Sequence, residues 1–278
     1  MATWDSLIRR AEVVHAPPIR AGWNKVGMTL VTFLAMLPPL AAAVVERGAK
    51  WLLLLLVSLI VVLTWQALFA VVRGRPWPLD GVLAALTFAL VLPPSLPVWK
   101  VAISLSFGIV AGQEVFGGRG HSFLNPAVVA LSFLIFSFPG GGLHSLTAVT
   151  ALSVIPGALL LVAVGLLSWR IIAGALAGTL VLAFASGMSE PIHLIVVASF
   201  VFGLVVYAAD PVAAASTNPG RWLYGLLFGA LTVLLSGAGP HISIESVILA
   251  ALLSSVFAPL IDVGTIWFNV YRRRRRYG

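Results

Sequence analysis

The sequence predicts an all-α polytopic membrane protein of about ten transmembrane helices, in two inverted five-helix halves with short half-helices. Hydrophobic residues make up 60% of the 278 residues and charged residues only 9%, which leaves too little polar surface for a soluble protein of this length. The apolar residues occur in runs separated by Gly, Pro or charged residues. The cations gather in alternate loops, as in proteins with several spans.

Two of the apolar runs are too short to cross about 30 Å of hydrocarbon as straight helices. One ends at Pro93-Pro94, and the other lies between Pro126 and Pro139. We expect half-helices of this kind to line a site. The runs are 27–46, 51–72, 80–95, 98–115, 126–139, 150–167, 169–186, 191–209, 221–237 and 244–268.

The runs predict a single transmembrane domain over 27–268, with halves of about 27–139 and 150–268. A cytoplasmic N-terminal segment, 1–26, precedes it, and a basic cytoplasmic tail, 269–278, follows it. Of the 17 Lys and Arg residues, all but Arg47, Lys50 and Lys100 fall on one side of the predicted membrane. This asymmetry predicts an even number of spans with both termini cytoplasmic.

Composition excludes several chemistries. The chain has no Cys, so disulfides and Cys-ligated iron–sulfur clusters are excluded, and we expect no haem. The net charge of +8 comes from cations between apolar runs and from the Arg272–Arg276 block. This placement indicates contact with anionic membrane lipids rather than with nucleic acid.

A Gly-rich stretch is the first candidate binding site. Gly117, Gly118 and Gly120 permit positive φ and a close backbone approach to a flat or anionic ligand, such as a flavin or nucleotide. Asn125 precedes a helix that starts at Pro126. The free N–H groups in the first turn of that helix are available to such a ligand. A plain tight turn between two helices would explain the same glycines.

Asp210, at the end of an apolar run, is the second candidate. An acid at that depth needs a partner or a cation, which makes it a functional candidate. Its alternative role is to cap the short segment that begins at Pro211.

Five ordered motifs resemble the NqrB/RnfD family, in a short variant. The resemblance runs from about residue 16 to the terminal arginines, and the family supplies a membrane subunit of the Na+-translocating NADH:quinone reductase and of the Rnf complex. The motifs are Glu114-Val115-Phe116-Gly117-Gly118 with Asn125-Pro126-Ala127; Ser168-Trp169-Arg170-Ile171; Asp210-Pro211-Val212; Gly220-Arg221-Trp222-Leu223-Tyr224-Gly225; and Phe257-Ala258-Pro259-Leu260-Ile261-Asp262.

The resemblance implies a bacterial inner-membrane subunit that holds flavin and works with other membrane and peripheral redox subunits, and in some members with quinone. It implies that Gly117, Gly118, Gly120, Asn125 and Asp210 lie at the cofactor or quinone region. It makes Asp262 the candidate Na+ or H+ site, with a pair to a terminal arginine as the alternative.

The main departure concerns the segment where family members attach FMN to a Thr. Here the segment is shorter, and its nearest equivalent runs from Leu146 to Leu152 without the Ser-Gly or Asp-Gly lead. The residue in the attachment position is Thr150. An ordinary helix start at Ser145 or Thr147 explains the same letters, so FMN covalently bound at Thr150 and non-covalent flavin both remain open.

These expectations lead to three functional readings. The first is a subunit of an oxidoreductase or translocase, rather than an enzyme alone, that passes electrons through flavin toward quinone or an outward-facing acceptor, coupled to Na+ or H+ translocation. The second is a cofactor-poor scaffold of the same family that docks a redox or other membrane complex. The third is a non-redox secondary transporter, because inverted repeats with broken helices serve that role as well.

Overall fold

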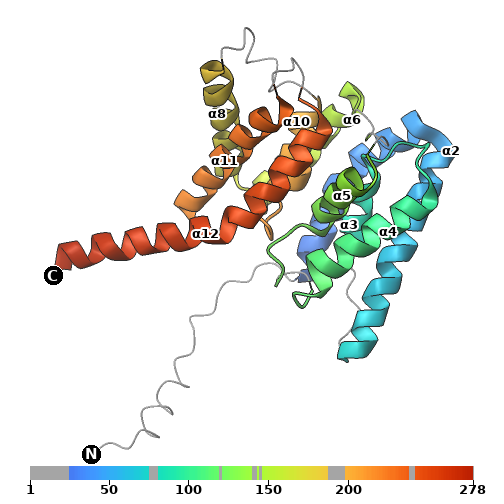
Figure 1. Cartoon of the computed structure of the whole chain (residues 1–278), viewed down its shortest axis with the longest axis horizontal. Coiled ribbons are helices and arrows are strands. Elements are labelled where there is room, and N and C mark those ends of the chain that lie inside the picture. The colour runs from blue at the N-terminus through green and yellow to red at the C-terminus, as the bar shows by residue number, and fades with distance from the viewer. Residues whose placement is uncertain are drawn as a thin grey trace, which may run out of the picture.

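The computed structural model describes residues 25–74, 81–118, 121–139, 143, 146–186, 198–237 and 242–277. All regular secondary structure in these ranges is helical, as predicted. Helices of the first half of the chain, blue to green in Figure 1, lie beside those of the second half, yellow to red. Contacts of α2 with α7 and of α5 with α12 join the two groups.

Helix α2 (Lys25–Arg73) consists of two arms joined at Gly48. Gly48 has φ 66° and ψ −160°, a backbone conformation that is essentially confined to glycine. The arms match the first two apolar runs, and each is long enough to cross about 30 Å of hydrocarbon.

Helix α3 (Gly81–Ala89) is short and almost completely buried. Its nine residues span only about 13 Å, and the chain then turns toward Pro93-Pro94 instead of remaining helical to residue 95. Three side chains from other helices bind carbonyls at its C-terminal end, where helical partners are missing, although Ala89 O also accepts from the N–H of Leu92. Arg47 Nη1 donates to Leu90 O over 2.5 Å, Trp51 Nε1 to Ala89 O over 2.8 Å, and Tyr207 Oη to Thr87 O over 2.8 Å.

Helix α4 (Val98–Ile109) continues as a π-helical segment, η1 (Val110–Glu114), and α5 (Pro126–Ser137) follows after a turn. Gly108 lets α4 approach the start of α5, because a Cβ at Gly108 would lie 2.5 Å from the carbonyl oxygen of Pro126. The two runs therefore form a tight helical pair whose connecting turn lies at one end.

The second half contains seven described segments, each near a predicted run. Ser153 interrupts the first of these runs. Helix α12 continues through the basic tail, because neither Gly nor Pro lies between Gly264 and the end of the helix. The segments are α6 (Ala148–Leu152), α7 (Val154–Val164), α8 (Trp169–Ala185), α10 (Ala198–Gly203), η2 (Leu204–Ala208), α11 (Asn218–Ser236) and α12 (Ile244–Tyr277).

Helices α8 and α11 pack backbone against backbone in parallel. Each presents two glycines four residues apart: Gly174 and Gly178 on α8, and Gly225 and Gly229 on α11. A Cβ at Gly174 would lie 2.8 Å from the Trp222 carbonyl oxygen, and one at Gly225 would lie 2.5 Å from that of Ile171. Small residues at this spacing are typical of helix pairs in membranes.

Among the described residues, two helices are long and apolar enough to cross a membrane, namely Gly27–Arg73, which contains both arms of α2, and Ile244–Arg272. Shorter apolar helices accompany them over Pro126–Ser137, Val149–Val164, Trp169–Ala185 and Ala198–Ala208. Large apolar side chains on the outer faces are exposed, Val45 at 84% and Val71 at 81% among them. Such a surface suits lipid rather than water.

Candidate functional site

Two turns from different halves of the chain meet at one place. The first turn follows η1 and ends at Asn125, and the second follows η2 and contains Asp210. Asn125 Nδ2 donates a hydrogen bond to Asp210 Oδ2 over 2.9 Å, although 85 residues separate the two. The structure thus brings together two residues that the sequence singled out independently.

Each of these side chains also holds its own turn. Asn125 Oδ1 accepts from the N–H of Ala127 over 3.0 Å and so caps α5. Asp210 Oδ1 accepts from the N–H of Val212 over 3.1 Å. Asp210 therefore has both the partner expected of an acid at this depth and the capping role proposed as its alternative.

A cavity of about 60 Å³ lies beside the Asn125–Asp210 hydrogen bond. Both halves of the chain contribute to its wall, including residues of both π-helical segments, a kind of turn that is frequent at functional sites. Most of the lining is apolar, and the described lining contains no Lys, Arg or His. Its polar members are Thr32, Thr87, Gln113, Ser122, Asn125 and Asp210.

The glycine turn stands next to this cavity without lining it. Gly117 and Gly118 have φ of 106° and 95°, which explains why glycine is needed at both positions. The N–H of Gly118 donates to Gln113 O, and that of Gly117 to Glu114 O, each over 3.0 Å. The turn thereby fixes the end of η1, while Gly120 lies outside the described residues.

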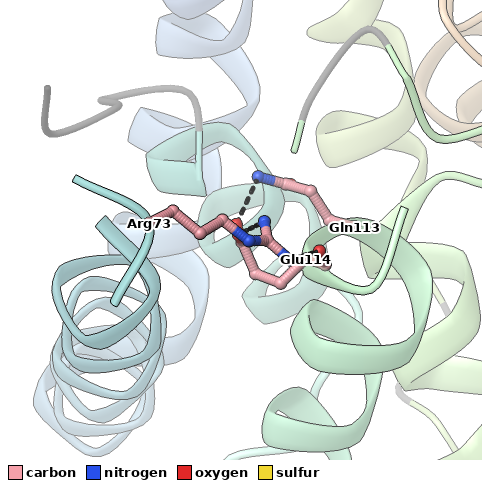
Figure 2. A network of polar contacts seen from close by, with 3 residues as sticks. All are labelled: Arg73, Gln113 and Glu114. Atoms are coloured by element: carbon pink, nitrogen blue, oxygen red, sulfur yellow. Dashed lines mark hydrogen bonds and ion pairs between the residues drawn. The ribbon is translucent and has the colours of Figure 1, made fainter. Parts of the chain in front are cut away.

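Figure 2 shows a polar network formed by Arg73, Gln113 and Glu114. Arg73 Nη1 lies 3.3 Å from Glu114 Oε2, and Arg73 Nη2 also donates to the backbone oxygen of Glu114. Gln113 Nε2 donates to the other carboxylate oxygen over 3.3 Å. The ion pair therefore holds the amide of Gln113, which lines the cavity.

The sequence contained a signal for this network that our predictions did not use. Glu114 ends an apolar run just as Asp210 does, so the argument that selected Asp210 applies to it equally. Arg73 ends another run on the same predicted side of the membrane. An acid and a base in these positions are a candidate pair, but only the fold shows which run lies beside which.

Thr150 lies elsewhere, in the short helix α6. Its side chain is fully buried, and its hydroxyl donates to Glu46 Oε2 over 2.7 Å. The hydroxyl of Thr147 contacts both oxygens of Glu46, at 2.7 and 2.8 Å, and also accepts from the N–H of Thr150. Glu46 thus ties the start of α6 to α2, close to the Gly48 bend.

This arrangement does not fit an FMN ester at Thr150. The hydroxyl that would carry the phosphate is buried, and an anionic phosphate there would lie against the Glu46 carboxylate. The cavity beside Asp210 fits a neutral polar ring better, because amides and a carboxylate can bind its N–H and carbonyl groups. Its present volume holds a few water molecules, so a flavin there requires the two turns to separate.

Asp262 is held by the same turn that contains Asp210, at its other end. Its Oδ2 accepts from the N–H and hydroxyl of Ser216, both over 2.8 Å. Its Oδ1 accepts from the N–H and hydroxyl of Thr217 over 3.0 and 2.6 Å. A role of Asp262 as a Na+ or H+ site stays a prediction, and a bound ion would have to displace some of these four hydrogen bonds.

Comparison with known proteins gives a consistent result. The model of the NQR2, RnfD, RnfE family matches residues 12–142 and 140–269. A protein of Pseudomonas paraeruginosa (strain DSM 24068 / PA7), described as a subunit of Na(+)-translocating NADH-quinone reductase, is 33% identical over 314 aligned residues, which cover 92% of this chain and 77% of the relative.

Two further relatives carry the same description. The protein of Ectopseudomonas mendocina (strain ymp) is 33% identical over 287 residues, covering 84% of this chain and 71% of its own length. That of Yersinia pestis is 31% identical over 271 residues, covering 76% and 65%. The similarity thus extends over most of the chain in each case.

Proposed function

Because this chain belongs to the NQR2, RnfD, RnfE family, we propose that it is the membrane subunit of a redox complex and passes electrons through a bound flavin. The electrons come from a partner on the cytoplasmic side and go to quinone or to an outward-facing acceptor. The relatives' description as subunits of a Na(+)-translocating reductase supports coupling to Na+ or H+ movement. The chain is then one part of an oxidoreductase rather than an enzyme alone.

The observation that carries this proposal is the cavity at the junction of the two turns. A largely apolar cavity with a few convergent polar groups is typical of ligand sites in helical bundles, and this one uses residues of both halves. The flavin supplies the one- and two-electron chemistry. The protein's own groups exclude water and hold the ring.

Particular residues have distinct roles in this proposal. The Asp210 carboxylate accepts hydrogen bonds from N–H or hydroxyl groups of the ligand, and the Gln113 amide, fixed through Glu114, binds a second polar edge. Asn125 holds Asp210 in place in the closed cavity, and this hydrogen bond breaks when the two turns separate around the ligand. Because the described lining carries one carboxylate and no cation, the ligand is bound by its ring or hydroxyl groups rather than by a phosphate.

We also propose ten spans with both termini in the cytoplasm. The helices agree with this count once two irregularities are considered. The bend at Gly48 divides α2 into two spans, and α6 and α7 together form one span. The parallel packing of α8 and α11 agrees with it, since the seventh and ninth of ten spans run in the same direction. The two halves then have inverted topologies.

The flavin proposal is tested on the purified chain. Absorbance of the native protein and fluorescence after denaturation should show flavin released into solution, and the intact mass should equal that of the bare chain. A colourless, flavin-free preparation would contradict the proposal. A mass increased by FMN on the peptide containing Thr150 would instead place the flavin on that side chain.

A second candidate function is a cofactor-poor scaffold that docks a redox complex. The buried, hydrogen-bonded hydroxyl of Thr150 favours it, because this chain would then lack the attachment used in the family. Copurification from its native membrane separates the two functions. A scaffold should copurify with redox subunits while the chain itself, after separation, releases no flavin.

A further inference from the structure

Two motifs of the sequence analysis that take no part in the cavity meet at another place in the fold. Trp169 and Arg170 begin α8, and Arg221 and Trp222 lie in the first two turns of α11. Because α8 and α11 are parallel and in close contact, these residues lie at the same end of the pair. We call Trp169, Arg170, Arg221 and Trp222 the Trp–Arg cluster.

The cluster is ordered by contacts among its own members and their neighbours. The rings of Trp169 and Trp222 meet edge to face with centroids 5.6 Å apart, and the guanidinium carbon of Arg170 lies 5.4 Å from the Trp169 ring centroid. Arg170 Nη1 donates to Asn218 Oδ1 over 3.1 Å, and Arg221 Nε donates to Ala215 O over 3.3 Å. Each arginine is thus held on one side by a neutral acceptor.

The two arginines of the cluster have neutral acceptors instead of an anionic partner among the described residues. Within the part of the chain that the structure describes, neither arginine lies within salt-bridge distance of a carboxylate. The nearby carboxylate of Asp262 accepts four hydrogen bonds from Ser216 and Thr217. Neither α8 nor α11 has an acidic residue in its first turn, where the helix dipole favours negative charge.

The cluster therefore places two positive charges at helix ends where the helix dipole is also positive. A bound anion would reduce the resulting electrostatic repulsion. One further group supports this reading. The hydroxyl of Ser168, the N-cap residue of α8, is buried and has no hydrogen-bond partner among the described residues, and it does not cap the helix. The N–H of Ile171 donates to Ser168 O over 3.1 Å, so the first turn of α8 keeps the N–H groups of Trp169 and Arg170 for an outside acceptor.

The surroundings point to a lipid as the source of that anion. Trp169 is 55% exposed and Trp222 37% exposed, at the end of two apolar helices, which is the depth that Trp occupies at a membrane surface. Arginine binds phosphate through two parallel hydrogen bonds. We propose that the Trp–Arg cluster binds the phosphate of an anionic phospholipid headgroup, with the two Trp rings against its glycerol and upper acyl chains.

The test uses the full chain, purified in a nonionic detergent, with added phosphatidylglycerol, phosphatidylcholine or inorganic phosphate. Native mass spectrometry measures the fraction of protein that retains one lipid, and a thermal melt measures the stabilisation. The wild type should retain phosphatidylglycerol and melt at a higher temperature with it. Phosphatidylcholine or inorganic phosphate should have little effect.

The matched variants are the double substitution Arg170→Gln/Arg221→Gln and the control Lys100→Gln. Lys100 is also a cation stacked on an exposed Trp ring, that of Trp99, but it lies outside both the cluster and the basic tail. The double variant should retain phosphatidylglycerol about tenfold less well, as expected for the loss of two charge-assisted contacts, and Lys100→Gln should retain it like the wild type. Arg170→Lys/Arg221→Lys should restore part of the binding.

Three results would overturn the proposal. They are equal lipid retention by the double variant and the wild type, an equal loss in Lys100→Gln, and stabilisation by inorganic phosphate as large as that by the lipid. If the double variant does not fold, the preference of the wild type for phosphatidylglycerol and the Lys variant decide the outcome. None of these measurements depends on flavin, so the proposal stands or falls separately from the proposed function.

Discussion

Two asparagines that precede proline at a helix start have different roles in this protein. Asn125 is the N-cap of α5 and also binds Asp210 across the two halves. At the start of α11 the capping residue is Thr217, whose hydroxyl accepts from the N–H of Gly220 over 3.2 Å. Asn218 there is exposed and, within the described ranges, its side chain only accepts from Arg170, so the same dipeptide is structural in one place and peripheral in the other.

This difference predicts unequal costs for the same substitution. Asn125→Ala removes a cap and a part-buried hydrogen bond, so it should lower the free energy of unfolding by about 2 kcal/mol. Asn218→Ala should lower it by less than about 0.5 kcal/mol because its contact is exposed. Denaturant titration in mixed micelles measures both, and equal effects would show that Asn125 does not have the roles described.

The Arg73–Glu114 pair predicts coupling between two residues from different helices. Glu114 is 4% exposed, and Arg73 binds both its carboxylate and its backbone oxygen. In a double-mutant cycle, Arg73→Gln and Glu114→Gln should each destabilise the protein, and the pair should show a coupling energy of about 1 kcal/mol. A coupling near zero would mean that the ion pair does not hold Gln113 in place.

At the scale of helices, glycine spacing determines how closely α8 and α11 approach. The first turns of both helices, with the Trp–Arg cluster, are brought together only because Gly174, Gly178, Gly225 and Gly229 carry no Cβ. This close contact places the carbonyl of one backbone against the glycine of the other. Substitution by even the smallest side chain must therefore push the helices apart.

Two glycine-to-alanine substitutions in helices should accordingly have opposite effects. At Gly225, a Cβ would lie 2.5 Å from Ile171 O, so Gly225→Ala should destabilise the protein by about 2 kcal/mol or more. Gly264 in α12 has open space around it, so Gly264→Ala should be neutral or stabilise the protein by up to about 1 kcal/mol. Thermal melts of the two variants give the comparison, and a similar loss in both would contradict close packing of α8 on α11.

For the whole molecule, the proposed ten spans predict which positions face each side of the membrane. The chain contains no Cys, so single-cysteine variants give an unambiguous label. Lys50→Cys and Lys100→Cys should react with a membrane-impermeant maleimide in intact cells, whereas Arg170→Cys and Arg272→Cys should react only after permeabilisation. Labelling of all four in intact cells would refute the proposed orientation.

Most of the helical segments could be predicted from the sequence because apolar runs and Pro or Gly breaks determine them locally. The sequence also singled out Asn125 and Asp210, one as a helix start and one as an acid at the end of an apolar run. Their hydrogen bond could not be predicted, because it depends on how the two halves pack. The surroundings of Thr150 could not be predicted either. The local sequence agrees with an attachment site, and only the fold shows that Glu46 lies beside the Thr150 hydroxyl.

The capping of α3 also constrains the order in which the protein can be completed during synthesis. Arg47 and Trp51, which bind carbonyls at the end of α3, precede it in the chain, whereas Tyr207 follows Thr87 by 120 residues. When only the first half has been synthesised, the Thr87 carbonyl therefore still lacks its donor, Tyr207. In a membrane such an unsatisfied carbonyl is costly. The first half acquires its final structure only when the second half has been made.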